Sequence, residues 1–348
     1  MDPLILFFLT SGLFLGWALG ANDAANVFGT AVGTRMVKWR TAAIICAVFI
    51  ILGALISGAG ASHTLGKLGA ISTLPGAFMT ALSAGASVFL MTKSGLPVST
   101  SQAIVGAIIG WNLFSSNPTD IGVLSKILST WIICPVLSAI IAVILLKSYK
   151  TSSKYLKVHL ISADAYTRIA LILAGAFGAY SLGANNIANV VGVFIPAKPF
   201  PDLEIGPYVF SSTQQLFLLG GLAIAFGVFT YSKGVMMTVG GNLGRLSPSA
   251  ALITVISHSI VLFLFASRGL EAWLSSHGLP TIPLVPVSSS QAVVGAIVGI
   301  SILQGTAGIQ WHVLGKIFAG WVATPFVAGL ICFIGLFFLQ NVFGLKVV

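Results

Sequence analysis

Two sequence motifs that each occur twice, in the same order, constrain this chain more than any other feature. The first, called here the GAN motif, reads GANDAANVFG from Gly20 and GANNIANVVG from Gly183, with seven of ten positions identical. The second, the PVS motif, reads PVSTSQAIVGAIIG from Pro97 and PVSSSQAVVGAIVG from Pro286, with eleven of fourteen identical. Such self-similarity predicts that the chain contains two structural repeats of the same fold.

The composition places both copies in a membrane. Of 348 residues, 57% are hydrophobic and 7% are charged, against roughly 25% charged in a soluble domain. The length suits about ten helical segments of roughly 20 residues, which leaves little chain for a soluble catalytic domain. We find no nucleophile with a base at a recognisable spacing, so an enzyme is not expected. The excess of Lys and Arg fits membrane topology better than nucleic-acid binding. The cysteines, in apolar runs, are expected to be small buried hydrophobes without a disulfide: Cys46, Cys134 and Cys332.

The apolar segments predict the membrane crossings. They cover residues 3–32, 39–58, 75–92, 121–146, a long stretch from 165 through the second GAN motif, 216–231, 248–266 and 313–339. We expect the first helix to be kinked or opened at Gly20, and an outer loop at 196–207. The run at 103–113 spans only about 16 Å, roughly half of a 30 Å hydrocarbon core. This length predicts a half-helix or re-entrant element at each PVS motif.

Basic residues set the expected orientation. The cluster Arg35, Lys38 and Arg40 predicts a cytoplasmic turn and an external N-terminus. We divide the chain into a first transmembrane repeat (1–147), a basic cytoplasmic linker (148–162) and a second transmembrane repeat (163–348). Five crossings per repeat, or three if the PVS element is re-entrant, are both odd numbers. The predicted fold is therefore an all-α polytopic membrane protein with two inverted-topology repeats, whose broken or re-entrant half-helices meet near the midplane.

The GAN motif carries the chemistry of a cation site. Asp23 is the carboxylate within an apolar segment, and charge at membrane depth is costly enough to suggest a function. Asn22 and Asn26 share a helical face, and Asn185 and Asn189 repeat that spacing. Their oxygens are ligands that a hard cation such as Na⁺ prefers. The alternative is that Asn and Gly merely support close helix packing and hydrogen bonds between helices.

The PVS motif carries the chemistry of an anion site. Pro97 fits the first helical turn, and Ser99 is a good N-cap. The next residues present backbone N–H groups without helical partners, and such helix ends bind anions. Ordinary capping with small-residue packing is the alternative, but two copies favour a binding site. The hydroxyl and amide groups that add donors without charge are Ser99, Thr100, Ser101, Gln102, Ser288, Ser289, Ser290 and Gln291.

An anion beside Asp23 would be repelled unless cations lie between them. This conflict predicts cation-coupled anion binding. Lys93, Lys126 and Lys316 are candidates for attracting the anion, or they snorkel from segment ends. No two histidines show i, i+4 pairing, and we expect packing or interface roles for four of the five: His63, His258, His277 and His312.

The two motifs, each with a second copy in the same order, resemble the signatures of the inorganic phosphate transporter (PiT) family. The resemblance extends over nearly the whole chain. It implies inverted repeats, external termini, a cytoplasmic central loop, a homodimer and phosphate symport with Na⁺ or H⁺ across the cell membrane. Substrate binding is then assigned to Asn22, Asn185 and the eight Ser, Thr and Gln residues above. Cation binding is assigned to Asp23, Asn26, Asn186 and Asn189.

The chain also departs from that family pattern. Family members usually have an Asp at the position of Asn186, and many have a His where Gln102 and Gln291 stand. A Glu of the second helix has no counterpart here. Fewer acids and histidines favour Na⁺ over H⁺ as the coupling ion, with no other cofactor. The alternatives left open are a proton-coupled phosphate or sulfate permease, an anion channel, and a structural subunit without transport.

Overall fold

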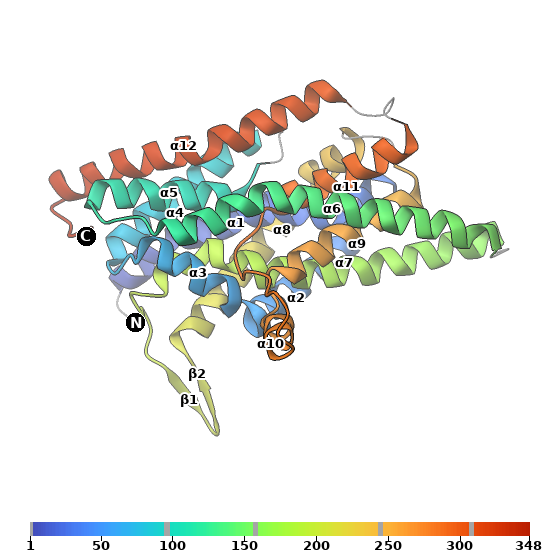
Figure 1. Ribbon diagram of the computed structural model, residues 1–348. Helices are drawn as coiled ribbons and strands as arrows, with labels where there is room; N and C mark the ends of the chain where they lie inside the picture. Colours follow the sequence, from blue (N-terminus) through green and yellow to red (C-terminus); the bar gives the residue numbers. More distant parts are fainter. Residues whose placement is uncertain (1–2, 94–97, 156–158, 243–245, 306–309) are drawn as a thin grey trace.

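The structure, a computed structural model, describes residues 3–93, 98–155, 159–242, 246–305 and 310–348 as a bundle of helices (Figure 1). Within that part of the chain the elements are α1 (Pro3–Gly33), α2 (Trp39–Ser57), α3 (Ala59–Gly69), α4 (Leu74–Lys93), α5 (Thr100–Ser115), α6 (Ile121–Tyr155), α7 (Leu160–Val191), η1 (Gly192–Phe194), β1 (Leu203–Ile205), β2 (Tyr208–Phe210), α8 (Ser212–Asn242), α9 (Pro248–Leu264), α10 (Arg268–Ser276), α11 (Ser289–Gln304) and α12 (Trp311–Asn341).

Seven helices of the described chain are long and apolar enough to cross a membrane, and α9 with α10 forms a further pair bent by 64°. Large apolar side chains cover the outside of this bundle, among them Ile132 on α6 and Phe326 on α12, which are 72% and 75% exposed. An exposed apolar surface of this extent, on helices long enough to span a bilayer, is typical of contact with lipid. The predicted multi-pass membrane architecture is therefore confirmed.

The GAN motifs lie within continuous helices. We expected the first helix to be kinked or opened at Gly20, and the opening does not occur, because both α1 and α7 run through their motif without a break. The small residues keep the backbone helical and permit close packing instead. A Cβ on Gly20 would collide with the Ile224 carbonyl of α8, and one on Gly183 with the Ile50 carbonyl of α2. These glycines serve the approach of two helices.

The PVS motifs lead into short helices, as predicted, but α11 begins after Ser288, so Pro286 precedes the helix instead of lying in its first turn, and Pro97 lies outside the described residues. α5 and α11 contain 16 residues each, which is about 24 Å at 1.5 Å per residue and less than a 30 Å hydrocarbon core. They start earlier than the expected 103–113 run, because Ser99 and Ser288 cap the helices. Each serine side chain accepts a hydrogen bond from the backbone N–H three residues later.

The two repeats exchange packing partners. α1 packs on α8 and α7 packs on α2, while α5 packs on α12 and α11 on α6. Equivalent glycines make equivalent contacts: a Cβ on Gly106 would meet Pro325 of α12, and a Cβ on Gly295 would meet Pro135 of α6. In Figure 1 the chain runs along α6 and α12 in opposite directions. Each repeat therefore completes the helix packing of the other.

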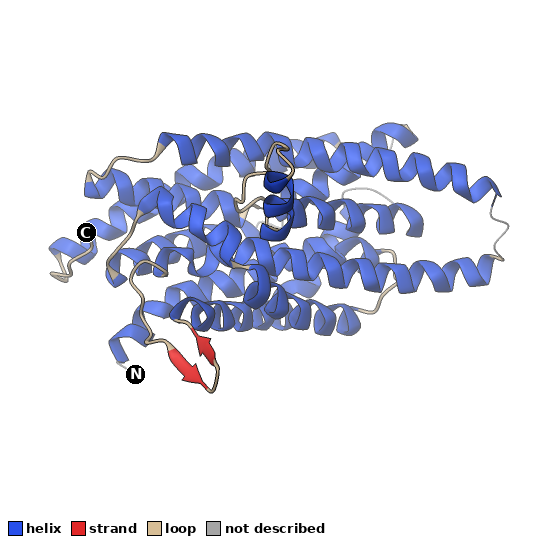
Figure 2. Ribbon diagram, turned by 60° about the horizontal axis from the view of Figure 1, so that its bottom comes forward, coloured by secondary structure: helices blue, strands red, loops and turns tan. Residues whose placement is uncertain are grey.

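Three regions differ from the sequence-based expectation. The 148–162 linker is largely helical, because α6 continues to Tyr155 and α7 starts at Leu160; the two helices extend past the bundle as an antiparallel pair (Figure 2). The expected outer loop contains an antiparallel hairpin in which Leu203 pairs with Phe210. α10 is an additional short helix with no buried residue. All three are polar or exposed segments, where hydrophobic periodicity carries little information.

Candidate functional site

The two GAN motifs meet around Asp23, which is 1% exposed. Asn22 donates from Nδ2 to Asp23 Oδ1 at 2.8 Å. Asn186, from the other motif copy, donates from Nδ2 to Asp23 Oδ2 at 3.3 Å. One amide from each repeat therefore holds the same carboxylate. The structure brings together all six polar GAN residues as a buried group: Asn22, Asp23, Asn26, Asn185, Asn186 and Asn189.

Hydrogen bonds between the GAN and PVS motifs cross from one repeat to the other. Asn189 Nδ2 of α7 donates to Ser101 Oγ of α5 at 2.9 Å, and Asn26 Nδ2 of α1 donates to Ser289 Oγ of α11 at 3.4 Å. Ser101 Oγ in turn donates to the Val287 carbonyl at 3.0 Å. The two motif types, far apart in sequence, thus form one site, called here the central site. It contains every residue to which binding was assigned from the sequence.

The amide oxygens of the central site are left for a ligand. The Oδ1 atoms of Asn22, Asn26, Asn186 and Asn189 are buried and have no hydrogen-bond partner in the described structure. For Asn22 and Asn186 this orientation is fixed, because Nδ2 faces the Asp23 carboxylate. An unpaired buried acceptor costs about 1–3 kcal/mol. Bound Na⁺ would satisfy such oxygens, so the donor set fits the assigned cation.

The two half-helix ends place donors beside these oxygens. Ser99 Oγ accepts from Gln102 N at 3.2 Å, and Ser288 Oγ accepts from Gln291 N at 3.3 Å. Ser99, Thr100, Ser101 and Gln102 are all buried, and so are their four counterparts. The positive ends of both helices are thus shielded from solvent near one carboxylate. Anion binding at buried helix N-termini is a common use of such geometry.

A cavity of about 770 Å³ adjoins the two PVS motifs and adds two residues that the sequence analysis missed. It is lined by Gln102, Gln291, Trp131 and Trp321, together with apolar residues of α5, α6 and α12. The Nε1 atoms of both tryptophans and the Oε1 atoms of both glutamines are buried without a partner in the described chain. Indole N–H groups only donate, so the two buried indoles offer neutral donors, while the rest of the space is mainly apolar and opens at Phe326 on the lipid-facing surface. The available signal was that Trp131 and Trp321 occupy equivalent repeat positions.

His258 is a third residue that the sequence analysis missed. It lies on α9, is fully buried and places Nε2 2.9 Å from Ser289 Oγ. Ser289 Oγ donates its one proton to the Asp23 backbone carbonyl at 3.3 Å, so the histidine Nε2 must be the donor in their bond. Nδ1 is then an acceptor, and it has no partner in the described structure. The predicted packing role therefore does not describe His258 fully, because its side chain also contacts Ser289. The sequence does not reveal this contact, since no residue spacing connects α9 with the motifs.

The remaining candidates fall outside the central site. Lys93 lies over the Phe89 ring, 4.8 Å from its centroid, and Lys316 is exposed on α12. Lys126 lines a second cavity. The three cysteines are buried and unpaired, as expected. No group of three His, Cys, Asp or Glu side chains suited to a metal occurs in the described ranges.

Comparison with known proteins gives consistent matches over the whole chain. The family model described as the phosphate transporter family matches residues 19–331 and 277–347. A protein of Methanocaldococcus jannaschii named as a candidate phosphate permease is 28% identical, covering 94% of this chain and 95% of the relative. The sulfate permease CysP of Bacillus subtilis is 29% identical, covering 91% and 82%.

One solved structure, described as the sodium-dependent phosphate transporter, superposes with a TM-score of 0.76. The alignment covers 97% of this chain and 98% of that one, with 22% sequence identity. At this identity the likeness establishes the shared fold.

Proposed function

The chain belongs to the phosphate transporter family, and from this premise we propose that it is a secondary transporter coupling uptake of inorganic phosphate to Na⁺. The observation that carries the proposal is the pairing of Asp23 with unpartnered amide oxygens, next to two buried half-helix ends. A carboxylate within the membrane costs free energy, so its presence indicates a function. Its negative charge would repel phosphate unless a cation lay between them.

Na⁺ and phosphate bind to different groups of the central site in this proposal. Na⁺ binds the Asp23 carboxylate with the unpartnered Oδ1 atoms of Asn22, Asn26, Asn186 and Asn189, and it neutralises the carboxylate charge. Phosphate then binds at the N-termini of α5 and α11, with the Gln102 and Gln291 side chains and the indole N–H groups of Trp131 and Trp321 as further donors. Phosphate affinity depends on Na⁺ because the two charges are favourable only together.

Alternating access is proposed to follow from the duplication. If the repeats are inverted, small movements within each repeat expose the same site to opposite sides of the membrane in turn. The exchanged packing of α1 on α8 and α7 on α2 supports two related arrangements of one fold. The proposed setting is the cell membrane, with external termini, residues 148–162 in the cytoplasm, and a homodimer.

The test is uptake of labelled phosphate into proteoliposomes under an imposed Na⁺ gradient. Asp23→Asn should abolish concentrative uptake, while thermal unfolding in detergent reports whether the variant remains folded. Retained Na⁺-driven uptake in the folded variant would refute the assigned role. Downhill flux without accumulation in the wild type would instead indicate an anion channel.

Two observations favour a second candidate, a proton-coupled or sulfate-selective permease. The unpartnered Nδ1 of His258, next to Ser289, can accept a proton. A relative at 29% identity is named a sulfate permease. Separate Na⁺ and H⁺ gradients, each tested with labelled phosphate and sulfate, distinguish the four combinations. Loss of H⁺-driven but not Na⁺-driven uptake in His258→Gln would identify the histidine as the proton carrier.

A further inference from the structure

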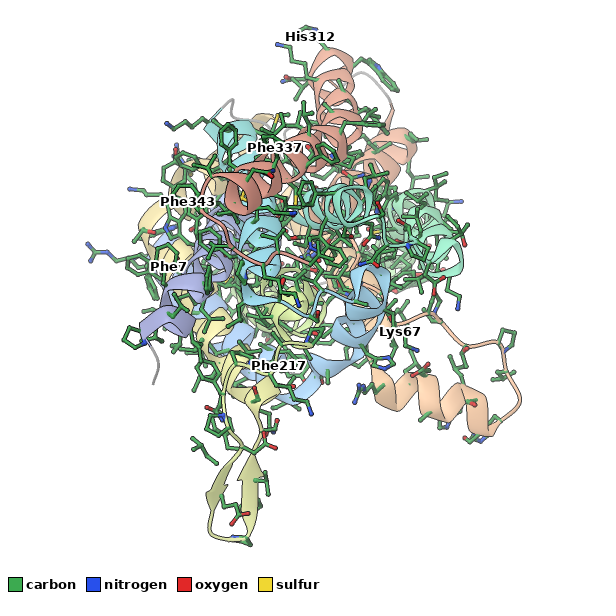
Figure 3. All side chains as sticks on the ribbon, turned by 90° about the vertical axis from the view of Figure 1, so that its left-hand side faces the viewer. Phe7, Lys67, Phe217, His312, Phe337 and Phe343 are labelled. Carbon is green, nitrogen blue, oxygen red and sulfur yellow. The ribbon has the colours of Figure 1, made fainter. Side chains whose placement is uncertain are left out.

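A second cavity, called here the basic cavity, lies between α3, α6, α10 and residues 281–285. Its volume is about 640 Å³, and its charged or titratable lining residues are His63, Lys67, Lys126, Arg268 and Glu271. Figure 3 shows Lys67 on the side of α3 that faces α10. Ionisable side chains in a membrane protein generally face water-filled spaces instead of lipid. His63, Lys67, Lys126 and Arg268 are exposed, and α10 has no buried residue, so the cavity is a water-filled cleft open at the surface of the bundle.

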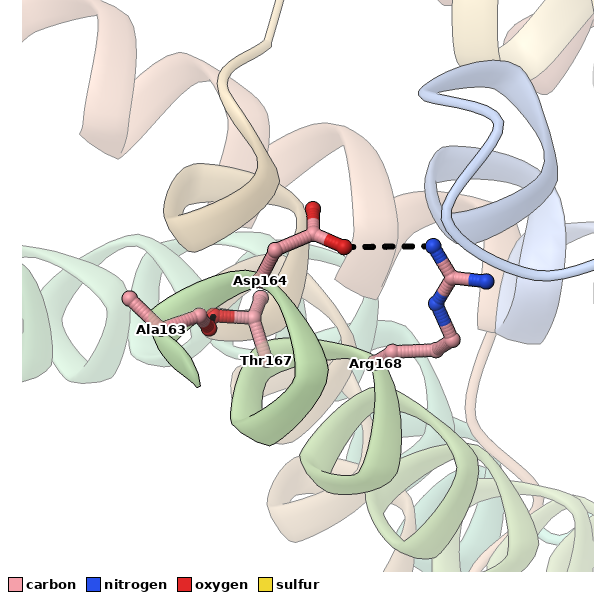
Figure 4. Close-up of polar contacts among 4 residues, drawn as sticks. All are labelled: Ala163, Asp164, Thr167 and Arg168. Atoms are coloured by element: carbon pink, nitrogen blue, oxygen red, sulfur yellow. Dashed lines mark hydrogen bonds and ion pairs between the residues drawn. The ribbon is translucent and has the colours of Figure 1, made fainter. Parts of the chain in front are cut away.

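The positive charges of this cavity outnumber its carboxylates. Lys67, Lys126 and Arg268 contribute three fixed positive charges and Glu271 one negative charge, which leaves two positive charges in excess. Across the described ranges, the one pair of a cation and a carboxylate within 4.0 Å is Arg168 with Asp164 at 3.2 Å (Figure 4). That pair lies on the exposed start of α7. The cavity thus carries a net charge that matches a divalent oxyanion.

The floor of the basic cavity is also a wall of the central site. Thr64 Oγ1 of α3 donates to the Leu284 carbonyl on the cavity side. Asn185 Nδ2 donates to the Val285 carbonyl at 3.0 Å, and Asn185 Oδ1 accepts from Val287 N at 2.8 Å. Residues 284–287 are therefore contacted by α3 from the cavity and by α7 from the central site. An anion in the cavity is separated from the central site by one extended segment.

The two spaces differ in the kind of donor they offer. In the described structure no Lys or Arg side chain hydrogen-bonds to the Asn, Ser or Gln side chains of the central site. Anion binding there must wait for a cation to offset Asp23. The basic cavity has permanent positive charge and no such requirement. Charged clefts of this kind raise the local concentration of an opposite charge by about 10- to 1,000-fold, with a steep dependence on ionic strength.

We propose that the basic cavity is an anion-collecting site that holds phosphate, independently of Na⁺, before it enters the central site. This inference rests on the proposed function, because it assumes that the central site takes phosphate. Lys67, Lys126 and Arg268 attract the anion, and residues 284–287 form the barrier that it must pass. The collecting site increases the rate at which phosphate is captured. The coupling to Na⁺ is still provided by Asp23.

The experiment compares Lys67→Gln, Lys126→Gln and the triple variant with Arg268→Gln against wild-type protein. In proteoliposomes under a Na⁺ gradient, the KM for phosphate should rise about 3- to 10-fold in the single variants and more in the triple variant. The maximal rate should stay within about twofold, since the central site is unchanged. Lys154→Gln, an exposed lysine on the same helix as Lys126, is the matched control and should leave the KM unchanged.

A second readout is equilibrium binding of labelled phosphate to the detergent-solubilised protein in the absence of Na⁺. Wild-type protein should bind weakly and lose binding as ionic strength rises, whereas the folded triple variant should not bind. If the triple variant has the same KM, salt dependence and Na⁺-free phosphate binding as wild-type protein, the collecting site is refuted. The proposed transport function would not be affected by that result. Na⁺-free binding that is lost in the triple variant, without uptake by the wild type, would instead refute the proposed transport and retain the anion site.

Discussion

The two GAN helices, α1 and α7, show how a duplicated scaffold can hold a single charge. Both helices are continuous, both bury their asparagines, and both approach a helix of the other repeat through a glycine. They differ in charge at one position: α1 has Asp23 where α7 has Asn186, and Asn186 donates to that carboxylate at 3.3 Å. The second repeat therefore supplies a neutral partner to the charge of the first. Family members usually have an Asp at the Asn186 position, but the hydrogen bond from Asn186 predicts that the central site of this chain works best with one carboxylate, on either helix.

The largest effect is expected from removing the Asp23 charge, and moving the charge to α7 should reverse part of it. Asp23→Asn alone should reduce Na⁺-driven phosphate uptake more than about 100-fold, since charge-assisted contacts are worth about 1.5–3 kcal/mol each and several are lost. The double variant Asp23→Asn, Asn186→Asp places the carboxylate on α7 and should recover part of the uptake. Proteoliposome uptake measures both. A double variant as inactive as the single one would show that the helices are not interchangeable.

A second carboxylate is expected to be the next most damaging change. Asn186→Asp puts a negative group where a donor now lies 3.3 Å from Asp23 Oδ2, and like charges so close repel strongly in a buried site. Uptake should fall about 10- to 100-fold and recover partly as Na⁺ concentration is raised, because an additional cation offsets the added charge. A variant with unchanged Na⁺ dependence would contradict the single-charge site.

The half-helices offer a stability test of the same symmetry. Gly106→Ala and Gly295→Ala each drive a Cβ into the backbone at Pro325 or Pro135. Each should destabilise the protein by about 1–3 kcal/mol, as overpacking usually does, and by similar amounts if the repeats are equivalent. Gly315→Ala on α12, where a Cβ meets no atom within 4 Å, is the matched control. Thermal unfolding in detergent measures all three; no loss at either helix would disprove the close packing.

The smallest effect distinguishes two equivalent serines. Ser101 Oγ links the repeats by accepting from Asn189 and donating to the Val287 carbonyl, whereas Ser290 Oγ bonds to Ser288 two residues away. Ser101→Ala should reduce uptake about 3- to 10-fold, corresponding to roughly one lost hydrogen bond. Ser290→Ala should stay within about twofold. Equal effects would mean that the cross-repeat bond has no separate role.

The fold could be predicted best from the long apolar segments and the repeated motifs. Hydrophobic run lengths gave the crossings, and the PVS motif predicted short capped helices that begin at Thr100 and Ser289. The prediction failed at Gly20, because glycine next to Asn and Asp was interpreted as a helix break. The structure instead uses Gly20 for contact with Ile224 of α8. Local residue chemistry does not distinguish a glycine that opens a helix from one that admits a neighbouring helix.

Three residues of the candidate site were not assigned a binding role from the sequence, for a different reason. His258 reaches Ser289 from α9, and Trp131 with Trp321 faces the cavity beside the glutamines. Each comes from a helix that carries no conspicuous polar motif. Their relevance depends on unpartnered atoms in a shared space, and such a property exists only once the helices are packed.

By itself, the sequence determined that this protein is a duplicated membrane fold with one buried carboxylate, because composition and repetition are properties of the linear chain. Only the tertiary structure decided which atoms meet: Asp23 is held by one asparagine from each repeat, and the lysines of α3 and α6 share a cavity. The physical reason is that hydrogen bonds and charge interactions act over a few ångströms in space, whereas these residues lie as many as 163 positions apart in the chain.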